Sequence, residues 1–448
     1  SVTGVQTCAL PISCGWRVSL YQDLCQRSAD PRHPFLIGPG ESLSLADMAQ
    51  ASSQCEGVAP GDVVALVGDF DASGIRNLLT LVDRRAIVMP LVAANHAQHE
   101  YCLASGHVDV VMAEGKLVRR QERQTAHPLL DRLRSRGHAG LILFSSGSTG
   151  MPKAIVHDFD TFLARFATPR PAWTTLGFLL FDHIGGLNTL FHMLYNDGLV
   201  VRPTARTVSA VLEDIRRHDI QLLPTTPTFL RMLVHSGLLD GSALPSLRLV
   251  TYGTEQMDQN TLSAAANLLP RVDFRQTYGM SELGILRVRT RKRDELWIQI
   301  GGEGVESRVR DCELHIRAEN RMLGYLNAPS PFDAEGWFNT KDLVETDGPW
   351  LRIVGRADSV INVGGLKVLP AEVESAALSF PGVRQAKAKG APNPLTGMHV
   401  ELLCQPGEGV ELSIDDLRRH LGEVLPPHAR PLRIRVGSVP TGHRFKQA

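Results

Sequence analysis

The sequence predicts an α/β protein whose largely parallel sheets are covered by helices, followed by an all-β segment and a small α+β unit. Three observations lead to this class. Apolar strand-like runs alternate with amphipathic helix-like runs up to about residue 285, helix-like runs disappear between about 286 and 355, and both kinds return after 356. Alternation of this length is typical of parallel sheets with helices on their faces. The all-β segment predicts a small barrel or an antiparallel sheet.

The elements of the first half follow from periodicity and from turn residues. Pro60 and Gly61 separate one element from the next, as such pairs usually do. Short apolar runs indicate buried strands, and amphipathic runs indicate helices. Helices are expected at 44–55 and 157–166, and strands are expected at 63–67, 85–92, 141–144 and 173–181.

The elements of the second half follow in the same way. Helices are expected at 207–219, 259–269, 370–380 and 414–425, and strands are expected at 220–227, 247–253, 313–317, 351–355 and 400–405. Pro370 suits the first turn of the helix that it opens.

Composition excludes several classes of function. Lys plus Arg and Asp plus Glu number 47 each, so the formal net charge is zero, which argues against a nucleic-acid-binding protein. The seven cysteines are scattered, and we expect free thiols in a reducing compartment, the cytoplasm. No apolar run of about 18 residues is present, so we expect no membrane span.

We do not expect the first 17 residues to be part of the fold. The stretch from Val2 to Ile12 resembles the in-frame translation of a sequencing adapter rather than a signal peptide, because it lacks a basic start and an apolar centre. We therefore expect residues 1–17 to be non-native. A natural disordered start is the alternative.

The stretch 145–153, "SSGSTGMPK", follows the apolar run "GLILF". Glycines allow close backbone approach, hydroxyls add hydrogen-bond donors, and Lys153 adds a positive charge, so the loop is suited to wrapping phosphate oxygens. The spacing does not fit the Walker template, because Met151 and Pro152 follow Gly150. A surface turn rich in Ser and Gly is the alternative reading.

Two further stretches contain residues suited to nucleotide chemistry. In "RQTYGMSELG" (275–284), Tyr278 can stack on a purine, Ser281 can bond a phosphate or carboxylate, and Glu282 can hold Mg²⁺. In "GWFNTKDLVETDG" (336–348), we expect Asp342 in a polar loop before a strand, where it can accept ribose hydroxyls. Each is equally an ordinary polar turn when taken alone.

Two glycine-containing stretches complete the set. In "GRADSVINVGGLKVLPAEVE" (355–374), the pair Gly364–Gly365 indicates a turn or a backbone that passes close to a neighbour. In "FDHIGGLNTL" (181–190), His183 precedes two glycines, and such a histidine is more often a packing or capping residue than a catalyst.

Together and in this order, these stretches resemble the adenylate-forming superfamily, and the resemblance runs from about residue 18 to the end of the chain. The stretches "TYGTE" (251–255) and "MLGYLNAPSPF" (322–332) resemble bacterial acyl-CoA synthetases of the fatty-acyl-CoA ligase type, which implies a fatty or other acyl substrate. The resemblance implies a large N-terminal domain at 18–355, with two helix-covered sheets and a small β-barrel, and a small mobile α+β C-terminal domain at 356–448. It also implies activation of a carboxylic acid by ATP to acyl-AMP, followed by transfer to the thiol of coenzyme A.

The family motifs assign roles residue by residue. Glu282 would hold Mg²⁺, Lys446, Ser281 and His183 would act in catalysis, and Asp358 would be the hinge of the C-terminal unit. The residues expected to bind the nucleotide or the thiol cofactor are Ser145, Ser146, Gly147, Ser148, Thr149, Gly150, Lys153, Gly253, Thr254, Glu255, Thr277, Tyr278, Gly279, Asp342, Arg356, Gly364, Gly365 and Lys367.

The sequence departs from the family pattern at two positions. Lys341 stands where the family has a glycine, and either changes the turn before Asp342 or points into solvent. The C-terminal element "VPTGHRFKQA" is irregular around Lys446, and Arg444 is the nearest other cation.

Two other functions stay open. One is an adenylation domain that loads an acyl or amino acid onto a carrier protein, in which Asp182 would meet a substrate amino group. The other is a nucleotide-binding relic without activity. The stretch His183–Gly186 favours an acyl ligase over the first alternative. The sequence does not reveal which acid is used.

Overall fold

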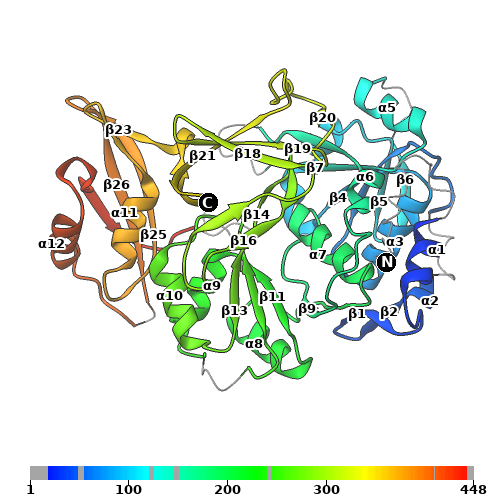
Figure 1. The fold of residues 1–448 in the computed structure, drawn as a ribbon, viewed down its shortest axis with the longest axis horizontal. Helices are drawn as coiled ribbons and strands as arrows, with labels where there is room; N and C mark the ends of the chain where they lie inside the picture. The colour runs from blue at the N-terminus through cyan, green and yellow to red at the C-terminus, as the bar shows by residue number, and fades with distance from the viewer. Residues whose placement is uncertain are drawn as a thin grey trace, which may run out of the picture.

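The structure is a computed structural model that describes residues 19–48, 55–120, 126–145, 151–239, 244–407 and 409–440. Two seven-stranded sheets form the bulk of the chain, a six-stranded antiparallel sheet follows, and a smaller sheet with its own helices lies at the C-terminal side (Figure 1). This is the α/β class that the sequence predicts.

The first seven-stranded sheet has the order β20-β8-β7-β4-β3-β5-β6. Its central strands pair in parallel, whereas β6, β8 and β20 are antiparallel to their neighbours. The bounds are β3 Val63–Val67, β4 Ile87–Leu91, β5 Val110–Ala113, β6 Lys116–Arg119, β7 Gly140–Phe144, β8 Ala154–Asp158 and β20 Gly324–Tyr325.

The second seven-stranded sheet has the order β13-β12-β11-β9-β10-β1-β2 and is parallel except for its last pair. The bounds are β1 Pro34–Gly38, β2 Glu41–Ser44, β9 Thr174–Leu176, β10 Leu199–Val201, β11 Leu222–Thr225, β12 Leu249–Tyr252 and β13 Asp273–Gln276.

Helices fill the space between these two sheets and cover their outer faces. Helices α3, α6 and α7 share one apolar core with residues of both sheets, while α8, α9 and α10 pack on the outer face of the second sheet. The bounds are α1 Leu20–Arg27, α2 Leu45–Met48, α3 Ala72–Asp83, α4 His99–Ser105, α5 Pro128–Arg136, α6 Phe159–Ala164, α7 Ile184–Leu194, α8 Val208–Arg217, α9 Pro227–His235 and α10 Gln259–Leu268, with a 3₁₀ segment η2 at Ala93–Gln98.

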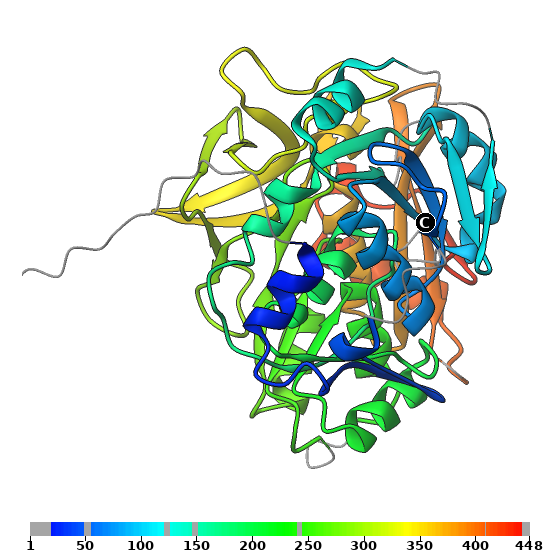
Figure 2. The same ribbon diagram turned by 90° about the vertical axis from the view of Figure 1, so that its right-hand side faces the viewer.

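The all-β segment forms a two-stranded hairpin and the six-stranded antiparallel sheet, which stands apart from the layered core in Figure 2. The hairpin consists of β14 Tyr278–Met280 and β15 Gly284–Leu286. The sheet has the order β16-β17-β22-β21-β19-β18, with bounds β16 Val288–Thr290, β17 Ile298–Ile300, β18 Val305–Arg310, β19 Glu313–Ala318, β21 Phe338–Asp347 and β22 Trp350–Arg356.

The C-terminal elements form a separate sheet with its own core. A short 3₁₀ segment, η3 (Ala357–Ser359), follows β22 and leads into this sheet. Its bounds are β23 Ile361–Val363, β24 Leu366–Val368, β25 Val383–Asn393, β26 Gly397–Pro406 and β27 Arg433–Val436, with helices α11 Pro370–Leu378 and α12 Ile414–Val424 and the 3₁₀ segment η4 Pro427–Ala429. The division at residues 355 and 356 stays a prediction.

Two local expectations are wrong. The helix expected at 157–166 begins only at Phe159, because His157 and Asp158 end the fully buried strand β8, and the Asp158 side chain then caps α6 by accepting from the N–H of Thr161. Asp342 does not lie in a loop before a strand. It lies within β21, where the pairing of this strand with β19 shifts register between Asn339 and Leu343. Residues 49–54 of the helix expected at 44–55 lie outside the described residues, and α2 spans Leu45–Met48.

Candidate functional site

The Ser/Gly-rich loop leaves β7 and returns into β8, and its two ends are joined. The N–H of Ser145 donates to the carbonyl of Lys153 (3.1 Å), and the N–H of Lys153 donates to the Ser145 hydroxyl (3.0 Å). The predicted phosphate-binding residues Ser146, Gly147, Ser148, Thr149 and Gly150 lie outside the described residues. These two hydrogen bonds hold Ser145 and Lys153 together, one on each side of the predicted phosphate-binding residues.

Asn327 holds the backbone at Pro152 and Ala154, on the C-terminal side of this loop. Its side-chain oxygen accepts from the N–H of Ala154 (2.9 Å), and its amide nitrogen donates to the carbonyl of Pro152 (3.1 Å) and to the Tyr101 hydroxyl (3.1 Å). Tyr101 in turn donates to the same Pro152 carbonyl (2.9 Å). Sequence reasoning did not single out Asn327, although it lies in the "MLGYLNAPSPF" stretch.

Tyr325 connects this loop to Glu282. The Lys153 ammonium nitrogen lies 5.1 Å from the centre of the Tyr325 ring, and the Tyr325 hydroxyl donates to Oε1 of Glu282 (2.8 Å). Burial and the charge of Glu282 raise the pKa of Tyr325, so this hydroxyl remains a donor. Lys153 therefore contacts Tyr325, and Tyr325 contacts Glu282. Tyr325, which the sequence did not identify as a site residue, thus connects two predicted site residues.

The hairpin β14–β15 carries the central motif, and its shape depends on glycine. A Cβ atom on Gly279 would lie 2.5 Å from the carbonyl oxygen of Gly284 on the opposite strand, so a larger residue does not fit. From the other side, the buried His157 donates from Nε2 to the carbonyl of Ser281 (2.6 Å). His157 thus positions the backbone immediately before Glu282.

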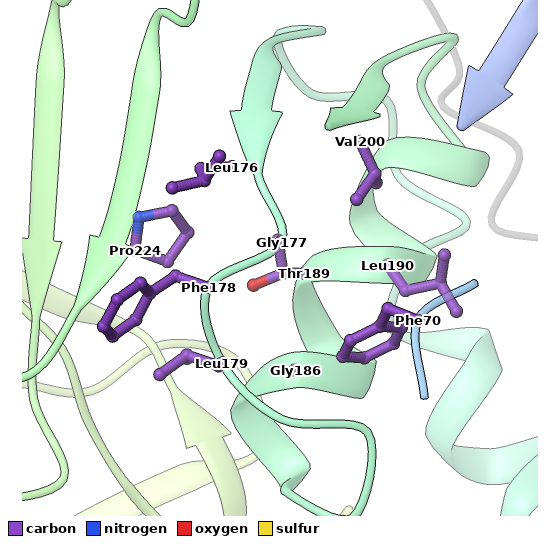
Figure 3. Close-up of a pocket in the computed structure, with 10 residues that line it drawn as sticks. All are labelled: Phe70, Leu176, Gly177, Phe178, Leu179, Gly186, Thr189, Leu190, Val200 and Pro224. Atoms are coloured by element: carbon purple, nitrogen blue, oxygen red, sulfur yellow. The ribbon is translucent and has the colours of Figure 1, made fainter. Parts of the chain in front are cut away.

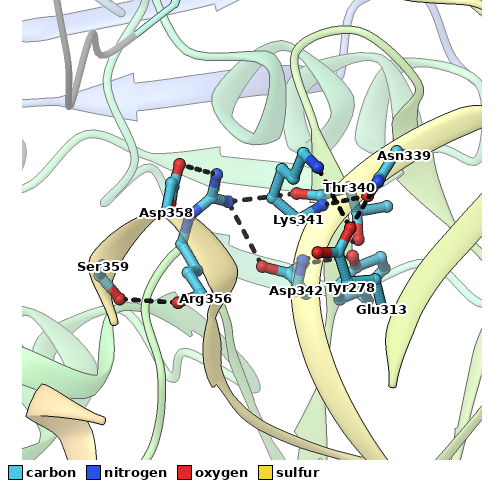
Figure 4. Close-up of polar contacts among 9 residues, drawn as sticks. All are labelled: Tyr278, Glu313, Asn339, Thr340, Lys341, Asp342, Arg356, Asp358 and Ser359. Atoms are coloured by element: carbon cyan, nitrogen blue, oxygen red, sulfur yellow. Dashed lines mark hydrogen bonds and ion pairs between the residues drawn. The ribbon is translucent and has the colours of Figure 1, made fainter. Parts of the chain in front are cut away.

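Asp342 and Tyr278 form the second part of the site (Figure 4). The Tyr278 hydroxyl donates to Oδ2 of Asp342 (2.5 Å), and Nη1 of Arg356 lies 3.3 Å from Oδ1. Burial raises the pKa of Asp342, against the opposing effects of the Tyr278 hydroxyl and the Arg356 charge. Burial and the neighbouring Asp342 carboxylate also raise the pKa of Tyr278.

Arg356 extends these contacts to the start of the C-terminal elements. Its Nε and Nη2 atoms donate to the two carboxylate oxygens of Asp358, at 3.0 and 2.8 Å. Its Nη1 atom also reaches the carbonyl of Thr340, at 3.4 Å. Two residues predicted from separate motif positions, Asp342 and Asp358, are therefore held by one guanidinium group.

Lys341 lies in a turn at the position where the resemblance implies a glycine. Its φ is +63°, in the left-handed region that favours glycine. Its N–H donates to Oδ1 of Asn339 (2.8 Å), and its ammonium group pairs with Glu313 (3.2 Å). The N–H of Asp342 donates to the Thr340 hydroxyl (3.1 Å). The departure therefore leaves the backbone turn in place.

The loop after β12 has close backbone contacts. A Cβ atom on Gly253 would lie 2.3 Å from the Thr277 hydroxyl oxygen, so this position requires glycine. Thr254 adopts a left-handed φ of +72°. Glu255 accepts from the hydroxyl (2.6 Å) and the N–H (3.3 Å) of Thr228, at the start of α9. This loop is thereby held against a helix N-terminus.

His183 caps α7, in line with the capping interpretation. Its Nδ1 accepts from the N–H of Gly185 (3.0 Å). A narrow apolar cavity of about 10 Å³ lies at the carboxyl ends of β9 and β11, and Gly186 of α7 is one of the residues that line it (Figure 3). Its lining residues are Phe70, Leu176, Gly177, Phe178, Leu179, Gly186, Thr189, Leu190, Val200 and Pro224.

The remaining predicted residues are not part of these contacts. Gly364 and Gly365 form the turn between β23 and β24, with φ of +60° and +86°, and the N–H of Gly364 donates to the carbonyl of Thr396. Lys367 is exposed on β24. Lys446 and Arg444 lie outside the described residues.

Two features are absent from the described residues. Within the described ranges, no group of three or more His, Cys, Asp and Glu side chains is arranged to hold a metal ion. None of the described helices has the length and apolar character that crossing a membrane requires.

Comparison with known proteins gives two family matches. Residues 63–326 match the family described as AMP-binding enzyme, and residues 372–445 match the AMP-binding enzyme C-terminal domain. Among curated relatives, a nicotinic acid–CoA ligase of Penicillium canescens is 27% identical over 56% of this chain and 50% of its own length. A fatty acid–[acyl-carrier-protein] ligase of Mycobacterium marinum is 28% identical over 62% of this chain and 60% of its own length. The chain therefore spans about half to three fifths of these relatives.

A solved structure agrees in fold. ATP-bound MatB from Rhodopseudomonas palustris superposes with a TM-score of 0.78 at 18% identity, covering 95% of this chain and 96% of that chain. At this identity the likeness concerns the fold alone.

Proposed function

The chain belongs to the AMP-binding enzyme family, and from that premise we propose that it is an AMP-forming acid–thiol ligase. In the first half-reaction, a carboxylate would attack the α-phosphate of ATP, giving acyl-AMP and pyrophosphate. In the second, a thiol would displace AMP and form a thioester. Coenzyme A is the proposed acceptor.

The observation that carries this proposal is the set of contacts around the β14–β15 hairpin. Between β14 and β15, Glu282 contacts Tyr325, which in turn contacts Lys153 beside the Ser/Gly-rich loop. At the first residue of β14, Tyr278 meets Asp342, which also pairs with Arg356. The cation and acceptor groups suited to phosphates and metal thus contact the turn of the hairpin, and a carboxylate suited to ribose hydroxyls contacts its first residue. Such a division fits one nucleotide lying across the hairpin.

The described residues fit one Mg²⁺ ion. Of the described residues, only Tyr325 donates to the Glu282 carboxylate, and it does so at Oε1. Mg²⁺ is commonly held by one or two carboxylates together with phosphate oxygens and water, so a full protein cage is unnecessary. When bound, the ion would offset charge on the phosphate oxygens. Glu282 would hold it, and Tyr325 and His157 would keep Glu282 and its backbone in position.

Asp342 and Arg356 would bind the ribose. Both Asp342 oxygens already have partners, Tyr278 and Arg356, so the carboxylate is oriented before a nucleotide arrives. Ribose hydroxyls would donate to the carboxylate. The charge of Asp342 therefore matters for binding.

The catalytic lysine remains part of the proposal. Lys446 would supply a positive charge where the carboxylate meets the α-phosphate, both of which are anionic. We also propose that residues 18–355 and 356–448 act as two domains that turn about Asp358 between half-reactions. The five free cysteines among the described residues fit a reducing compartment such as the cytoplasm.

Pyrophosphate exchange tests the proposal. Purified protein would be given ATP, Mg²⁺, labelled pyrophosphate and a panel of carboxylic acids. Acid-dependent label in ATP supports an adenylating enzyme, and absence of exchange with every acid supports the relic instead. Lys446→Ala should lower exchange by about 10²–10³, whereas Arg444→Ala serves as the matched control.

The acceptor needs a separate experiment. Curated relatives include both CoA ligases and ligases of acyl-carrier proteins, so both thiols are candidates. Thioester formation with coenzyme A and with a phosphopantetheinylated carrier protein should be measured side by side, starting from the acid that gives the fastest exchange. We expect the coenzyme A reaction to be faster.

A further inference from the structure

A larger cavity, of about 270 Å³, lies at the amino ends of β1 and β10. Pro34, the first residue of β1, lines it, and so does Gly198, which directly precedes β10. Both strands run parallel to β9, β11 and β12 in the second seven-stranded sheet. The loop 253–255 follows the carboxyl end of β12, so the cavity lies at the opposite ends of these strands from that part of the candidate nucleotide site.

Helix α7 separates this cavity from the narrow one near the motif 181–186. Gly186, near the start of α7, lines the narrow cavity, whereas Met193 and Leu194, in its last turn, line the larger one. A volume of about 270 Å³ is close to the lower end of the range for ligand pockets, which is about 300 Å³. The larger cavity therefore suits a small organic ligand rather than a nucleotide.

The apolar part of the wall comes from four different elements of the fold. It consists of side chains whose exposed fractions lie between 1 and 6 %, namely Phe35, Leu45, Met193 and Leu194. Helices α1 and α2, which contact each other, lie on this side of the chain (Figure 1). Burying an apolar ligand surface against such side chains is favourable.

Hydrogen bonds hold the loop 28–33 that forms the polar part of the wall. The N–H of Ala29 donates to Oδ2 of Asp197 (2.9 Å), which ties the loop to the turn before β10. The N–H of Ala46 donates to the carbonyl of Pro31 (2.8 Å), which ties the loop to α2. The cavity is thus formed by backbone that is fastened on both sides before any ligand arrives.

The polar part of the wall is acidic. Asp30 and Asp197 line the cavity, whereas lysine and arginine are absent from its described lining. Of the described residues, none donates to the second carboxylate oxygen of Asp197 and none forms an ion pair with it. Asp30 has one cation nearby, the highly exposed Arg32, whose Nε lies 3.9 Å from Oδ1. At least one carboxylate therefore lies beside the apolar wall without a positive partner among the described residues.

Two helices also end at this cavity. Ser28, which lines it, is the C-cap of α1, and Leu194, which also lines it, is the last residue of α7. The C-terminal end of a helix carries a partial negative charge and favours cations. The helix ends and the carboxylates therefore favour the same sign of charge in a ligand.

We propose that this cavity is a binding site for a small organic cation, an ammonium group attached to an apolar body of about the size of a phenylethyl group. The body would pack on the apolar wall, and the ammonium group would donate to the carboxylates of Asp30 and Asp197. This inference does not rest on the proposed function, because the cavity shares no lining residue with the candidate nucleotide site.

The test measures binding to the full chain by calorimetry, without ATP or an acid. The probe is 2-phenylethylammonium, and 2-phenylethanol is its uncharged counterpart. The variants are Asp30→Asn, Asp197→Asn and the double variant. Asparagine keeps an acceptor for the N–H of Ala29 and tolerates the left-handed φ of +52° at position 197. Asp219→Asn is the matched control, because Asp219 is exposed, has a φ of +49° and does not line the cavity.

The proposal predicts saturable binding of 2-phenylethylammonium to the wild-type chain and to Asp219→Asn with equal affinity. In the double variant we expect a dissociation constant that is about tenfold higher or more, because charge-assisted hydrogen bonds are lost. The alcohol should bind more weakly than the ammonium and equally to all chains. Thermal unfolding without ligand shows that the variants are folded, and only variants with the midpoint of Asp219→Asn are compared.

Three results would overturn the proposal. The first is no saturable binding of 2-phenylethylammonium to the wild-type chain. The second is equal affinity in the wild-type chain and the double variant, or an alcohol that binds as tightly as the ammonium, since either would show that charge plays no part. The third is self-association that the double variant abolishes while the ammonium fails to bind, which would assign the cavity to a second copy of the chain.

Discussion

Arg356 and Asp358 form a two-point ion pair, in which Nε and Nη2 of the guanidinium lie 3.0 and 2.8 Å from the two carboxylate oxygens. The remaining nitrogen of the same guanidinium reaches Asp342 at 3.3 Å. Asp358 sits in the short η3 segment between the antiparallel sheet and the C-terminal sheet. The candidate ribose carboxylate and the candidate hinge thus share one arginine.

The hinge prediction separates the two half-reactions. Asp358→Pro fixes φ near about −65° and should impede rotation of the C-terminal unit. We expect pyrophosphate exchange to persist and thioester formation to fall strongly. Asp358→Ala is the control, because it removes the ion pair with Arg356 and leaves φ free. Equal loss of both half-reactions in Asp358→Pro would instead indicate misfolding or a static C-terminal unit.

Asp342 gives a prediction about pH. Burial raises its pKa, so its carboxylate becomes protonated at a higher pH than an ordinary aspartate does. A protonated group accepts ribose hydroxyls less well, so the affinity for ATP should weaken as the pH falls through this raised pKa. Asp342→Asn should raise KM for ATP by about tenfold or more and should lack this pH step. KM for ATP would be measured from exchange across the pH range in which both chains stay folded. An identical pH dependence in the two chains would show that another group causes it.

Glu282 gives a prediction about the metal. Glu282→Gln can still accept from Tyr325 but loses the negative charge that attracts Mg²⁺. We expect acyl-AMP formation to fall by about 10²–10³, with a higher Mg²⁺ requirement. Tyr325→Phe is the matched control, because it removes the hydroxyl and keeps the carboxylate. Unchanged exchange and an unchanged Mg²⁺ titration in Glu282→Gln would remove this residue from the metal site.

The sequence predicts the fold class and most of the motif residues because both depend on local information. Strand and helix periodicity is local, and so is the composition of the loop 145–153. The end of β8 shows where such information fails. The sequence pattern predicts a helix at His157, yet this residue lies in a fully buried strand that pairs with β7, and the pairing is not visible in a single window of sequence.

The supporting residues of the site could not be predicted for a related reason. Tyr325 and Asn327 lie far along the chain from Lys153, and they meet it only because β20 pairs with β8. Glu313 pairs with Lys341 from the neighbouring strand β19. The residues that neighbour such a tyrosine, asparagine or glutamate in the sequence do not indicate that it will make these contacts. Only the tertiary structure reveals its role.

Lys341 gives a prediction about stability. A left-handed φ is unfavourable for a residue with a Cβ by about 1–2 kcal/mol, and more restrictive for a branched one. Lys341→Gly removes this strain and also removes the exposed pair with Glu313, which contributes little. We expect the free energy of unfolding to stay within about 1 kcal/mol of the wild-type value, with exchange retained. Lys341→Val should be clearly destabilised in the same denaturant titration. A strongly destabilised glycine variant would show that the lysine side chain, and not the turn, holds this segment.

His157 links the stability of the fold to the position of the reaction motif. Burial lowers its pKa to about 4, and its ring donates to the carbonyl of Ser281 in the neutral form. In the unfolded chain its pKa returns to about 6.5. Between these values the unfolded chain binds more protons, so the free energy of unfolding must fall as the pH drops from about 6.5 towards 4. For this one group the loss between pH 7 and pH 5 is about 2 kcal/mol.

The glutamine variant tests that link directly. His157→Gln keeps a donor for the Ser281 carbonyl and does not titrate. In denaturant titrations at pH 7 and pH 5, we expect it to lose about 2 kcal/mol less than the wild-type chain on acidification. Exchange at pH 7 should survive in His157→Gln and fall in His157→Ala, which leaves the Ser281 carbonyl without its donor. If His157 is a buried neutral group, replacing it by a residue that does not titrate must change how the free energy of unfolding depends on pH. Equal loss of this free energy on acidification in wild type and His157→Gln would therefore contradict the assignment.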